Sequence, residues 1–531
     1  MSRKILFLVF AFFSVLSAQI SFPLGSEVVD VTKEPYFAKG DGKADDTEAI
    51  QRALDDHPNG DFIIYLPHGT YKISKQISWP KADEPTEAYR RTIIQGESMG
   101  GTILMLKDKA KGFDNPNIPR AMIYTGIGPH PRHRNAIRDI SLRTGKGNPG
   151  AIGIRFNAAS QGTVFNVKIF SGDKNGAGVA GIDMGFAENV GPLLLKNIEV
   201  RGFDIGIYTR TPFFGMTMEH ITLTGQRKYG IENWDQALTI RGLRSRNSVP
   251  AIYNTGEYAM LTLIDGTLEY IPNKKSPPGP AIINEAGLFV RGVTTSKYKT
   301  PIKSTTPGLG EGIKGQEILE YVSENLINLC HSPKASMRLP VAEVMELPKQ
   351  TPPNWVKITG DYGGTAGDGR DVSKAIQEAI DDGAETIYFP PKGRYTINRD
   401  VYIRKRVRHI IGTEGRIEGT GRFIVLDGTF PDLTIERFSS FGNGIIHKSN
   451  RLLLLKNMMV KSYEGHEDGA GDVYMEDVSV SQIKLNFQHL WARQLHMNND
   501  KSTKIINNGG TLWVLGLTAE NGNTVLHNKN K

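Results

Sequence analysis

Residues whose types could do chemistry lie close together near the C-terminus. Trp491 and Trp513 could stack on a ring such as that of a sugar, and Arg493 and Gln494 could hold its hydroxyl groups. Glu520 follows them with a carboxyl group, which can act as a general acid or base. Each residue also has an ordinary structural explanation. An outward-facing aromatic side chain often packs under a loop, and a glutamate at a strand end is commonly a solvated carboxylate.

Hydrophobic alternation indicates how one of these side chains is oriented. Residues 512–514 form a predicted strand in which Leu512 and Val514 point inward. Trp513 must then point outward, because successive side chains of a strand lie on opposite faces.

Composition describes a globular chain without a cysteine-based centre. The 531 residues carry a formal charge of +8, with 39% hydrophobic and 23% charged residues. The single cysteine, Cys330, excludes an intramolecular disulfide framework and a cysteine-built metal site. The acidic group Asp41, Asp45 and Asp46 lacks the ligand spacing of a calcium loop, so we interpret it as a turn and helix cap. We predict no metal and no other cofactor.

The N-terminus reads as a targeting segment. Arg3 and Lys4 precede an apolar run over 5–16, and Ser17 and Ala18 fit a cleavage site. The run is too short for a spanning helix, so a signal peptide over 1–18 is favoured over a membrane anchor. The remaining positive charge is scattered, without the basic patch of a nucleic-acid-binding protein. We expect a secreted protein, periplasmic or extracellular, with no membrane association after cleavage.

Three blocks of the first half recur in the same order in the second half. Each copy has a Gly-Asp-Gly turn followed by a short amphipathic helix, then two strands around a Pro/Gly turn, then an apolar strand. The matched pairs are 40–54 with 367–380, 63–73 with 387–397, and 93–96 with 409–412. The chain therefore carries two copies of one unit.

Short strands follow each copy at a coil-like period. In the first half, a polar or glycine residue opens an apolar-alternating strand at Asn166, Asn197, His220 and Gly242, at spacings of 31, 23 and 22 residues. The second half continues with strands at 433–435, 453–455, 473–475 and 512–514. A period in the twenties with one strand per turn favours a parallel β-solenoid over a β-sandwich.

The repeat divides the chain into four parts. We predict a signal peptide over 1–18, a first solenoid over 19–330, a proline-rich linker over 331–356 and a second solenoid over 357–531. The linker could pack across both solenoids.

The duplicated opening resembles the pectate-lyase-like domain of right-handed β-helix carbohydrate enzymes. Two such domains in tandem resemble glycoside hydrolase family 55, the exo-acting β-1,3-glucanases. The family has a "WARQLNPE" segment and a later "GG-x-LWILG-x-KTE" strand, which are similar to residues 491–498 and 509–520 here. The resemblance implies an all-β fold of two tandem right-handed parallel β-helices, each opened by a short capping α-helix.

The family's site residues carry over one at a time. Glu520 aligns with the family's general acid. The glutamate that closes "WARQLNPE" is replaced by Asn498, which cannot take a proton but can bind a sugar hydroxyl. The family's water-holding glutamine has no counterpart in 211–215, although Gln226 and Gln236 are near in sequence. The resemblance implies an inverting reaction with a polysaccharide or oligosaccharide as partner.

Three functions remain open. The leading hypothesis is a secreted, monomeric glycoside hydrolase acting on a polysaccharide such as β-1,3-glucan, with Glu520 as general acid. A polysaccharide lyase or epimerase would need basic groups for an acidic sugar, and the run over 404–408 offers some. A non-catalytic glycan-binding protein would need only a stacking surface, since a fold alone does not fix a function.

Overall fold

The structure is a computed structural model that describes most of the chain. The described residues are 22, 26–58, 62–80, 83, 92–127, 132–273, 277–305, 312–313, 315–324, 336, 338–344, 355–391, 393–499 and 501–529. The predicted signal peptide and Cys330 lie outside them. None of the α-helices among the described residues has the length and apolar character needed to cross a bilayer.

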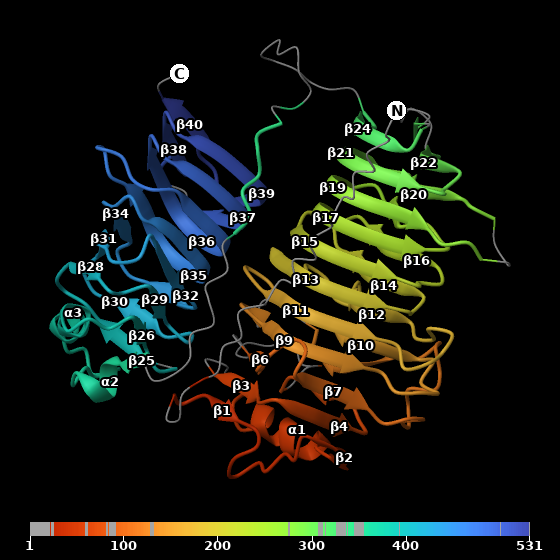
Figure 1. Ribbon diagram of the computed structural model, residues 1–531, viewed down its shortest axis with the longest axis horizontal. Coiled ribbons are helices and arrows are strands. Elements are labelled where there is room, and N and C mark those ends of the chain that lie inside the picture. The colour runs from red at the N-terminus through yellow and green to blue at the C-terminus, as the bar shows by residue number, and fades with distance from the viewer. Residues whose placement is uncertain are drawn as a thin grey trace, which may run out of the picture.

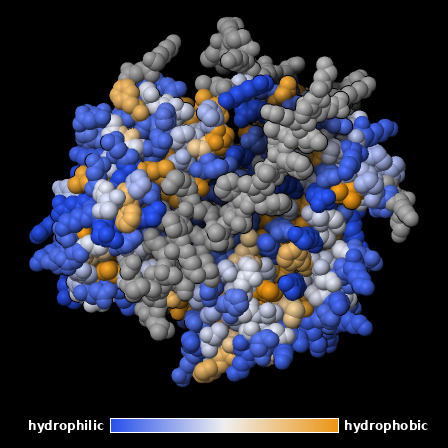
Figure 2. Space-filling view, viewed as in Figure 1, coloured by the Kyte–Doolittle hydropathy of each residue, from blue (hydrophilic) through white to orange (hydrophobic). Residues whose placement is uncertain are grey.

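The predicted fold class is confirmed, because the chain is almost entirely β and its strands pair in parallel. Two β-helices stand side by side, the first from red to green and the second from teal to blue in Figure 1. Helices α1 (Thr47–Asp55), α2 (Ile358–Asp361) and α3 (Ser373–Asp381) lie at the same end of the molecule. Figure 2 shows hydrophilic residues over most of one face, with hydrophobic residues scattered between them.

The first β-helix contains two sheets. Its pairings are parallel except at the last coil, where β24 and β23 pair antiparallel with β21 and β22. The 14-stranded sheet holds β1 (Val29–Asp30), β2 (Asp41–Asp45), β3 (Ile63–Leu66), β4 (Gly69–Ile73), β6 (Ile93–Gly96), β7 (Thr102–Leu106), β9 (Ala136–Arg143), β11 (Thr163–Phe170), β13 (Leu193–Arg201), β15 (Gly215–Thr224), β17 (Ala237–Asn247), β19 (Met260–Tyr270), β21 (Gly287–Ser296) and β24 (Glu317–Val322). The 10-stranded sheet holds β5 (Ile77–Ser78), β8 (Arg120–Tyr124), β10 (Ala151–Arg155), β12 (Ala180–Met184), β14 (Ile205–Arg210), β16 (Tyr229–Trp234), β18 (Ile252–Thr255), β20 (Pro280–Asn284), β22 (Thr300–Ser304) and β23 (Gly312–Ile313).

The second β-helix forms one 16-stranded sheet that bends around its core. Its strands are β25 (Trp355–Lys357), β26 (Thr386–Tyr388), β27 (Arg394–Thr396), β28 (Val401–Lys405), β29 (His409–Ile411), β30 (Arg416–Glu418), β31 (Phe423–Gly428), β32 (Asp432–Glu436), β33 (Ser440–Phe441), β34 (Ile445–His447), β35 (Leu452–Gly465), β36 (Val473–Asn486), β37 (His489–Asn498), β38 (Ile505–Asn508), β39 (Thr511–Glu520) and β40 (Leu526–Lys529).

The residues expected to open strands in the first half lie instead at a bend in mid-strand. Asn166, Asn197, His220 and Gly242 occupy equivalent places in β11, β13, β15 and β17, with φ between 52° and 72°. Asparagine and glycine tolerate this left-handed region, which explains their recurrence. Asn197 Nδ2 donates to Asn166 Oδ1 at 3.0 Å, and Asn166 Nδ2 donates to Asp139 Oδ1 at 2.8 Å. We call this column the ladder.

The core of each β-helix is a stack of aliphatic side chains. Val167, Ile198, Ile221 and Leu243 directly follow the four ladder residues and are all buried. Stacked strands lie about 4.8 Å apart, so each buried side chain packs against its counterpart in the next coil. The period found in the sequence is therefore the period of this stack.

Candidate functional site

The two β-helices meet along a polar surface that we call the seam. The strands facing each other across it run in opposite directions, because Thr217 Oγ1 donates to Gln494 Oε1 at 2.8 Å while Glu219 meets Arg493. A Cβ placed on Gly516 would lie 1.8 Å from Thr217 Oγ1, so the glycine lets β39 approach β15. Most sequence-predicted site residues lie in or beside this seam.

Glu219 is the centre of the seam's charge network. Its carboxylate lies 3.2 Å from Arg493 Nε, 2.7 Å from Arg241 Nη1 and 3.5 Å from Lys196 Nζ. Lys196 also pairs with Glu476. Burial alone would raise the pKa of Glu219, but the neighbouring Lys196 and Arg493 outweigh it and the pKa is lowered. The network thus joins both β-helices through ionised groups.

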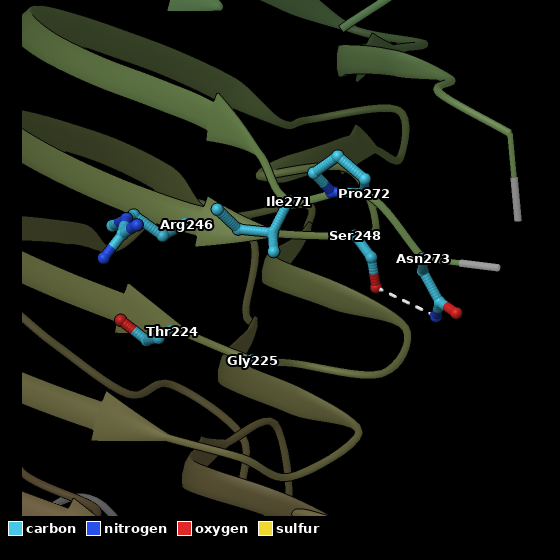
Figure 3. A pocket seen from close by; sticks show the side chains of 7 residues that line it. All are labelled: Thr224, Gly225, Arg246, Ser248, Ile271, Pro272 and Asn273. Carbon is cyan, nitrogen blue, oxygen red and sulfur yellow. Dashed lines mark hydrogen bonds between the residues drawn. The ribbon is translucent and has the colours of Figure 1, made fainter. Parts of the chain in front are cut away.

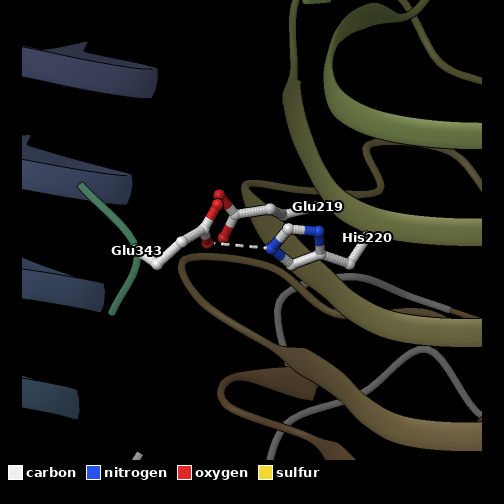
Figure 4. A group of neighbouring side chains, drawn as sticks. All are labelled: Glu219, His220 and Glu343. Atoms are coloured by element: carbon white, nitrogen blue, oxygen red, sulfur yellow. Dashed lines mark hydrogen bonds and ion pairs between the residues drawn. The ribbon is translucent and has the colours of Figure 1, made fainter. Parts of the chain in front are cut away.

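Glu219, His220 and Glu343 have the geometry of a possible cation site, shown in Figure 4. His220 Nε2 lies 3.1 Å from Glu343 Oε2, and Arg241 Nη2 donates to Glu343 Oε1 at 2.5 Å. Glu219 already faces three cationic side chains, Lys196, Arg241 and Arg493. The carboxylates are therefore neutralised by protein groups, and we assign this cluster to the seam.

Residues 338–344 of the predicted linker cross between the two β-helices, and we call them the crossing segment. Leu339 and Val341 pack with Trp513, which is 9% exposed. Arg493 Nη2 donates to the carbonyl of Ala342 at 2.5 Å. Trp513 does point away from the core of its own β-helix, but it packs beneath the crossing segment. Its burial leaves little ring surface for a sugar.

Arg493 and Gln494 are likewise buried in the seam. Arg493 lies with its guanidinium carbon 4.9 Å from the Trp513 ring centroid, and Gln494 accepts from Thr217. These contacts hold the β-helices together, so hydroxyl binding by either side chain has no support from its position. Trp491 is half-buried, stacked on Tyr474 at 5.2 Å, and sugar contact there stays a prediction.

Glu520 lies at the open end of the seam, at the last residue of β39. Its side chain is 39% exposed. Asn498 Nδ2 donates to Glu520 Oε2 at 3.1 Å, and His496 Nε2 lies 3.2 Å from Glu520 Oε1. His496 Nδ1 in turn lies 3.2 Å from Ser479 Oγ. The carboxylate is therefore held in place at its inner side while it stays open to solvent.

The first β-helix turns exposed aromatic side chains outward near this end of the seam. A Cβ on Gly215, at the start of β15, would lie 3.1 Å from Thr518 Oγ1, two residues before Glu520. Phe213 lies in the turn before Gly215, is 76% exposed and packs against Tyr258 at 4.8 Å. Trp234 is also exposed and lies at the end of β16 with Arg210 over its ring. Sequence reasoning missed Tyr258 and Trp234. Both lie just before strands of successive coils, and this recurrence of aromatic residues was the available signal.

Asp235 carries a carboxylate in the turn between β16 and β17, directly after Trp234. It precedes β17, which contacts β39 as β15 does. Its Oδ1 accepts from the backbone N–H of Tyr258 at 3.0 Å, and its backbone has a φ of 60°. The turn therefore holds Asp235 among the exposed aromatic side chains.

The two glutamines considered from sequence are structural. Gln236 is buried, and its Nε2 donates to the carbonyls of Phe214 and Val190. Gln226 is also buried, and its Nε2 donates to three backbone carbonyls, including that of Gly202 at 3.0 Å. Neither side chain is placed to hold a water molecule beside Glu520.

A shallow pocket of about 490 Å³ lies at the opposite ends of the strands (Figure 3). Thr224 ends β15 there, whereas Glu520 lies near the start of that strand. Arg246 in this pocket pairs with Glu269 at 3.0 Å. The pocket is therefore remote from Glu520, and the residues that line it include no carboxyl group.

Comparison with known proteins agrees with this architecture. Residues 31–267 match the family described as "Rhamnogalacturonase A/epimerase, pectate lyase-like". A probable glucan endo-1,3-beta-glucosidase of Arthroderma benhamiae is 34% identical over 129 residues, which is 24% of this chain and 13% of that protein. Alginate lyase 7 of Azotobacter vinelandii is 41% identical over 75 residues, 14% of this chain and 8% of that protein.

One of the solved structures that match is the catalytic unit of a GH87 alpha-1,3-glucanase from Streptomyces thermodiastaticus. It has 10% sequence identity and a TM-score of 0.30, and the match covers 97% of this chain and 70% of that one. The chain spans only a small part of the curated relatives. Residues 31–267 of the first β-helix are thus similar to the pectate-lyase-like family, and the relatives that match in sequence include carbohydrate-active enzymes.

Proposed function

We propose that this protein hydrolyses glycosidic bonds of a polysaccharide, with Glu520 as the general acid. The observation that carries the proposal is a half-exposed carboxylate held by Asn498 and His496 at the mouth of the seam, beside exposed aromatic side chains. Aromatic rings bind the apolar faces of sugars, and a positioned acid protonates the departing oxygen. The glucanase relative supports the same reaction class.

Hydrolysis with inversion also needs a group that activates water. Asn498 cannot do so, because an amide takes no proton at neutral pH. We assign this role to Asp235, which lies in the turn before β17, a strand that contacts β39. The two carboxyl groups of an inverting pair are separated by roughly 6.5–9.5 Å, which leaves room for the water molecule. The site would then take one carboxyl group from each β-helix.

The test is a panel of neutral and acidic polysaccharides incubated with the wild type, Glu520→Gln and Asp235→Asn. Reducing ends are assayed together with the absorbance of unsaturated products. We expect reducing ends without unsaturation from a neutral glucan, and a loss of about 10²–10⁴-fold in Glu520→Gln. A matched Glu257→Gln variant, on the same group of turns, should keep most activity. Unsaturated products would instead show a lyase.

We also propose that residues 1–18 are removed on export and that the mature protein acts outside the cytoplasm as a monomer. N-terminal sequencing of the protein recovered from the periplasm or medium tests the cleavage. An intact Met1 on the exported protein would contradict it.

A further inference from the structure

Three buried polar side chains form a cluster in the seam, away from the Glu520 site. Gln95 and Arg138 are register partners on β6 and β9 of the first β-helix. Arg437 follows the last residue of β32 in the second β-helix, and its Nη1 donates to Gln95 Oε1 at 2.8 Å. The strands β11 and β13 separate β9 from β15, a distance of about 14 Å. We call these three residues the arginine cluster.

Arg138 is a buried arginine that none of the described residues satisfies. Gln95, Arg138 and Arg437 are 0%, 3% and 4% exposed. Among the described residues, neither Nε nor Nη1 of Arg138 has a hydrogen-bond acceptor, and Gln95 Nε2 has none either. No carboxylate in this part of the chain lies within ion-pair distance of Arg138. Buried polar groups nearly always have a partner, so these free N–H groups require an explanation.

Arg134 shows how another arginine of the seam is held at a similar depth. Its guanidinium donates to Glu414 Oε2 at 3.0 Å, to Gln161 Oε1 at 2.7 Å and to the carbonyl of Asn457 at 2.6 Å. Arg138 is buried as deeply and has none of these kinds of contact among the described residues. The difference indicates an acceptor that comes from outside the chain.

Charge favours an anion over water as this acceptor. Burial and the nearby Arg437 lower the pKa of Arg138 to about 10, so its guanidinium stays charged at neutral pH. The carboxylates that act on it, Glu414, Glu436 and Asp477, lie beyond ion-pair distance and are each engaged by another side chain. A buried charge without a close counter-ion is costly, and water has no net charge to offset it.

The free polar atoms of the arginine cluster are all donors. Besides those of Arg138 and Gln95, Nε of Arg437 also lacks a hydrogen-bond acceptor among the described residues. A water molecule would bring two hydrogens of its own, for which the cluster offers no free acceptor. A monatomic anion only accepts, so it matches a set of donors without adding a new unsatisfied group.

We propose that the arginine cluster binds one chloride ion, with Arg138 and Gln95 donating to it and Arg437 adding its charge. The strands that carry Gln95 and Arg138 are about 4.8 Å apart, so one atom between the two side chains can accept from both. The ion would join the two β-helices, because Arg437 belongs to the second. The site is independent of the reaction proposed at Glu520.

The first test is crystallographic and uses the wild-type full chain. Crystals are grown with bromide as the only small anion, and an anomalous difference map is measured at the bromine edge. We expect a bromide peak in contact with Arg138 and Gln95. A map without a peak at Arg138 would show that neutral molecules satisfy its N–H groups, and it would overturn the proposal.

The second test is thermal unfolding with chloride exchanged for gluconate at constant ionic strength. An ion that binds only the folded protein lowers the unfolding constant, by up to about tenfold for each tenfold rise in chloride above its dissociation constant. Arg138→Met should abolish this dependence. The variant should still fold, because an apolar side chain of similar size replaces a buried charge.

Arg493→Met is the matched control. It removes an equally buried arginine that pairs with Glu219, so it should lower stability and keep the chloride dependence. Absence of chloride dependence in the wild type would overturn the proposal. So would equal dependence in Arg138→Met, or its loss in the control. Neither test uses a glycan, so both are read separately from the hydrolase proposal.

Discussion

Replacement of Asp139 by asparagine should stabilise the protein at neutral pH. Asp139 is buried at the end of the ladder, where its Oδ1 accepts from Asn166 Nδ2 at 2.8 Å. Burial raises its pKa to about 6, although Asn166, Arg437 and Arg138 act in the opposite direction. Compared with the unfolded chain, the folded protein favours the protonated form of Asp139. Ionisation of Asp139 at higher pH therefore lowers the free energy of unfolding.

The size of the change in unfolding free energy follows from the shift in the pKa of Asp139. The pKa rises from 3.8 to about 6, and each unit corresponds to about 1.4 kcal/mol, so ionisation costs the fold at most about 3 kcal/mol. Because the folded pKa is the higher one, the wild type keeps this stability below about pH 4 and loses it as the pH rises through about 6. The asparagine side chain of the variant does not ionise, tolerates the φ of 55° at this position and can still accept from Asn166.

The assay is urea unfolding of wild type and Asp139→Asn at several values between about pH 4 and pH 8. The difference in unfolding free energy should move in favour of the variant across that range, by up to about 3 kcal/mol. Asp114→Asn, an exposed site, serves as the control and should show no such trend. A pH-independent difference, or a variant that is less stable than wild type at about pH 8, would refute the reasoning.

Three further substitutions test the seam. Glu219→Gln should cost about 3–5 kcal/mol in unfolding free energy, because it leaves buried cations such as Arg493 without their carboxylate; a change under about 1 kcal/mol in urea unfolding would contradict this. Gly516→Val should destabilise by about 1–3 kcal/mol through its clash with the Thr217 hydroxyl. Adding Thr217→Ala removes that hydroxyl but should not remove the penalty of the left-handed backbone, and full recovery of stability in the double variant would contradict this. Trp513→Ala should cost about 3–5 kcal/mol and speed proteolysis between the β-helices; unchanged cleavage would show that Trp513 does not hold the crossing segment.

The coil architecture could be predicted from sequence because each coil repeats one local pattern. Aliphatic residues such as Ile198 and Ile221 return at the coil period, and they are buried because the β-helix encloses them. The sequence predicts strand starts at the polar residues before them, because period-2 alternation breaks there. The structure shows a left-handed bend instead, and alternation alone cannot separate a bend from a strand end.

The seam could not be predicted, because it depends on which faces of two β-helices meet. Arg493 and Gln494 have the same residue types as sugar-binding side chains, yet they are buried against Glu219 and Thr217. The available signal was a charged residue in the middle of consecutive strands, as at Lys196, which is buried in the structure. The structure places Glu520 beside Asn498, because neighbouring coils bring these two positions into register.

The most direct test of the proposed reaction compares two substrates in Glu520→Gln. A general acid matters for an alcohol leaving group but not for an activated aryl group that departs without a proton. We therefore predict that the variant loses about 10²–10⁴-fold in kcat on the natural glucan and keeps most of its activity on a dinitrophenyl glycoside of the same sugar. An equal loss on both substrates would contradict the role of Glu520 as general acid.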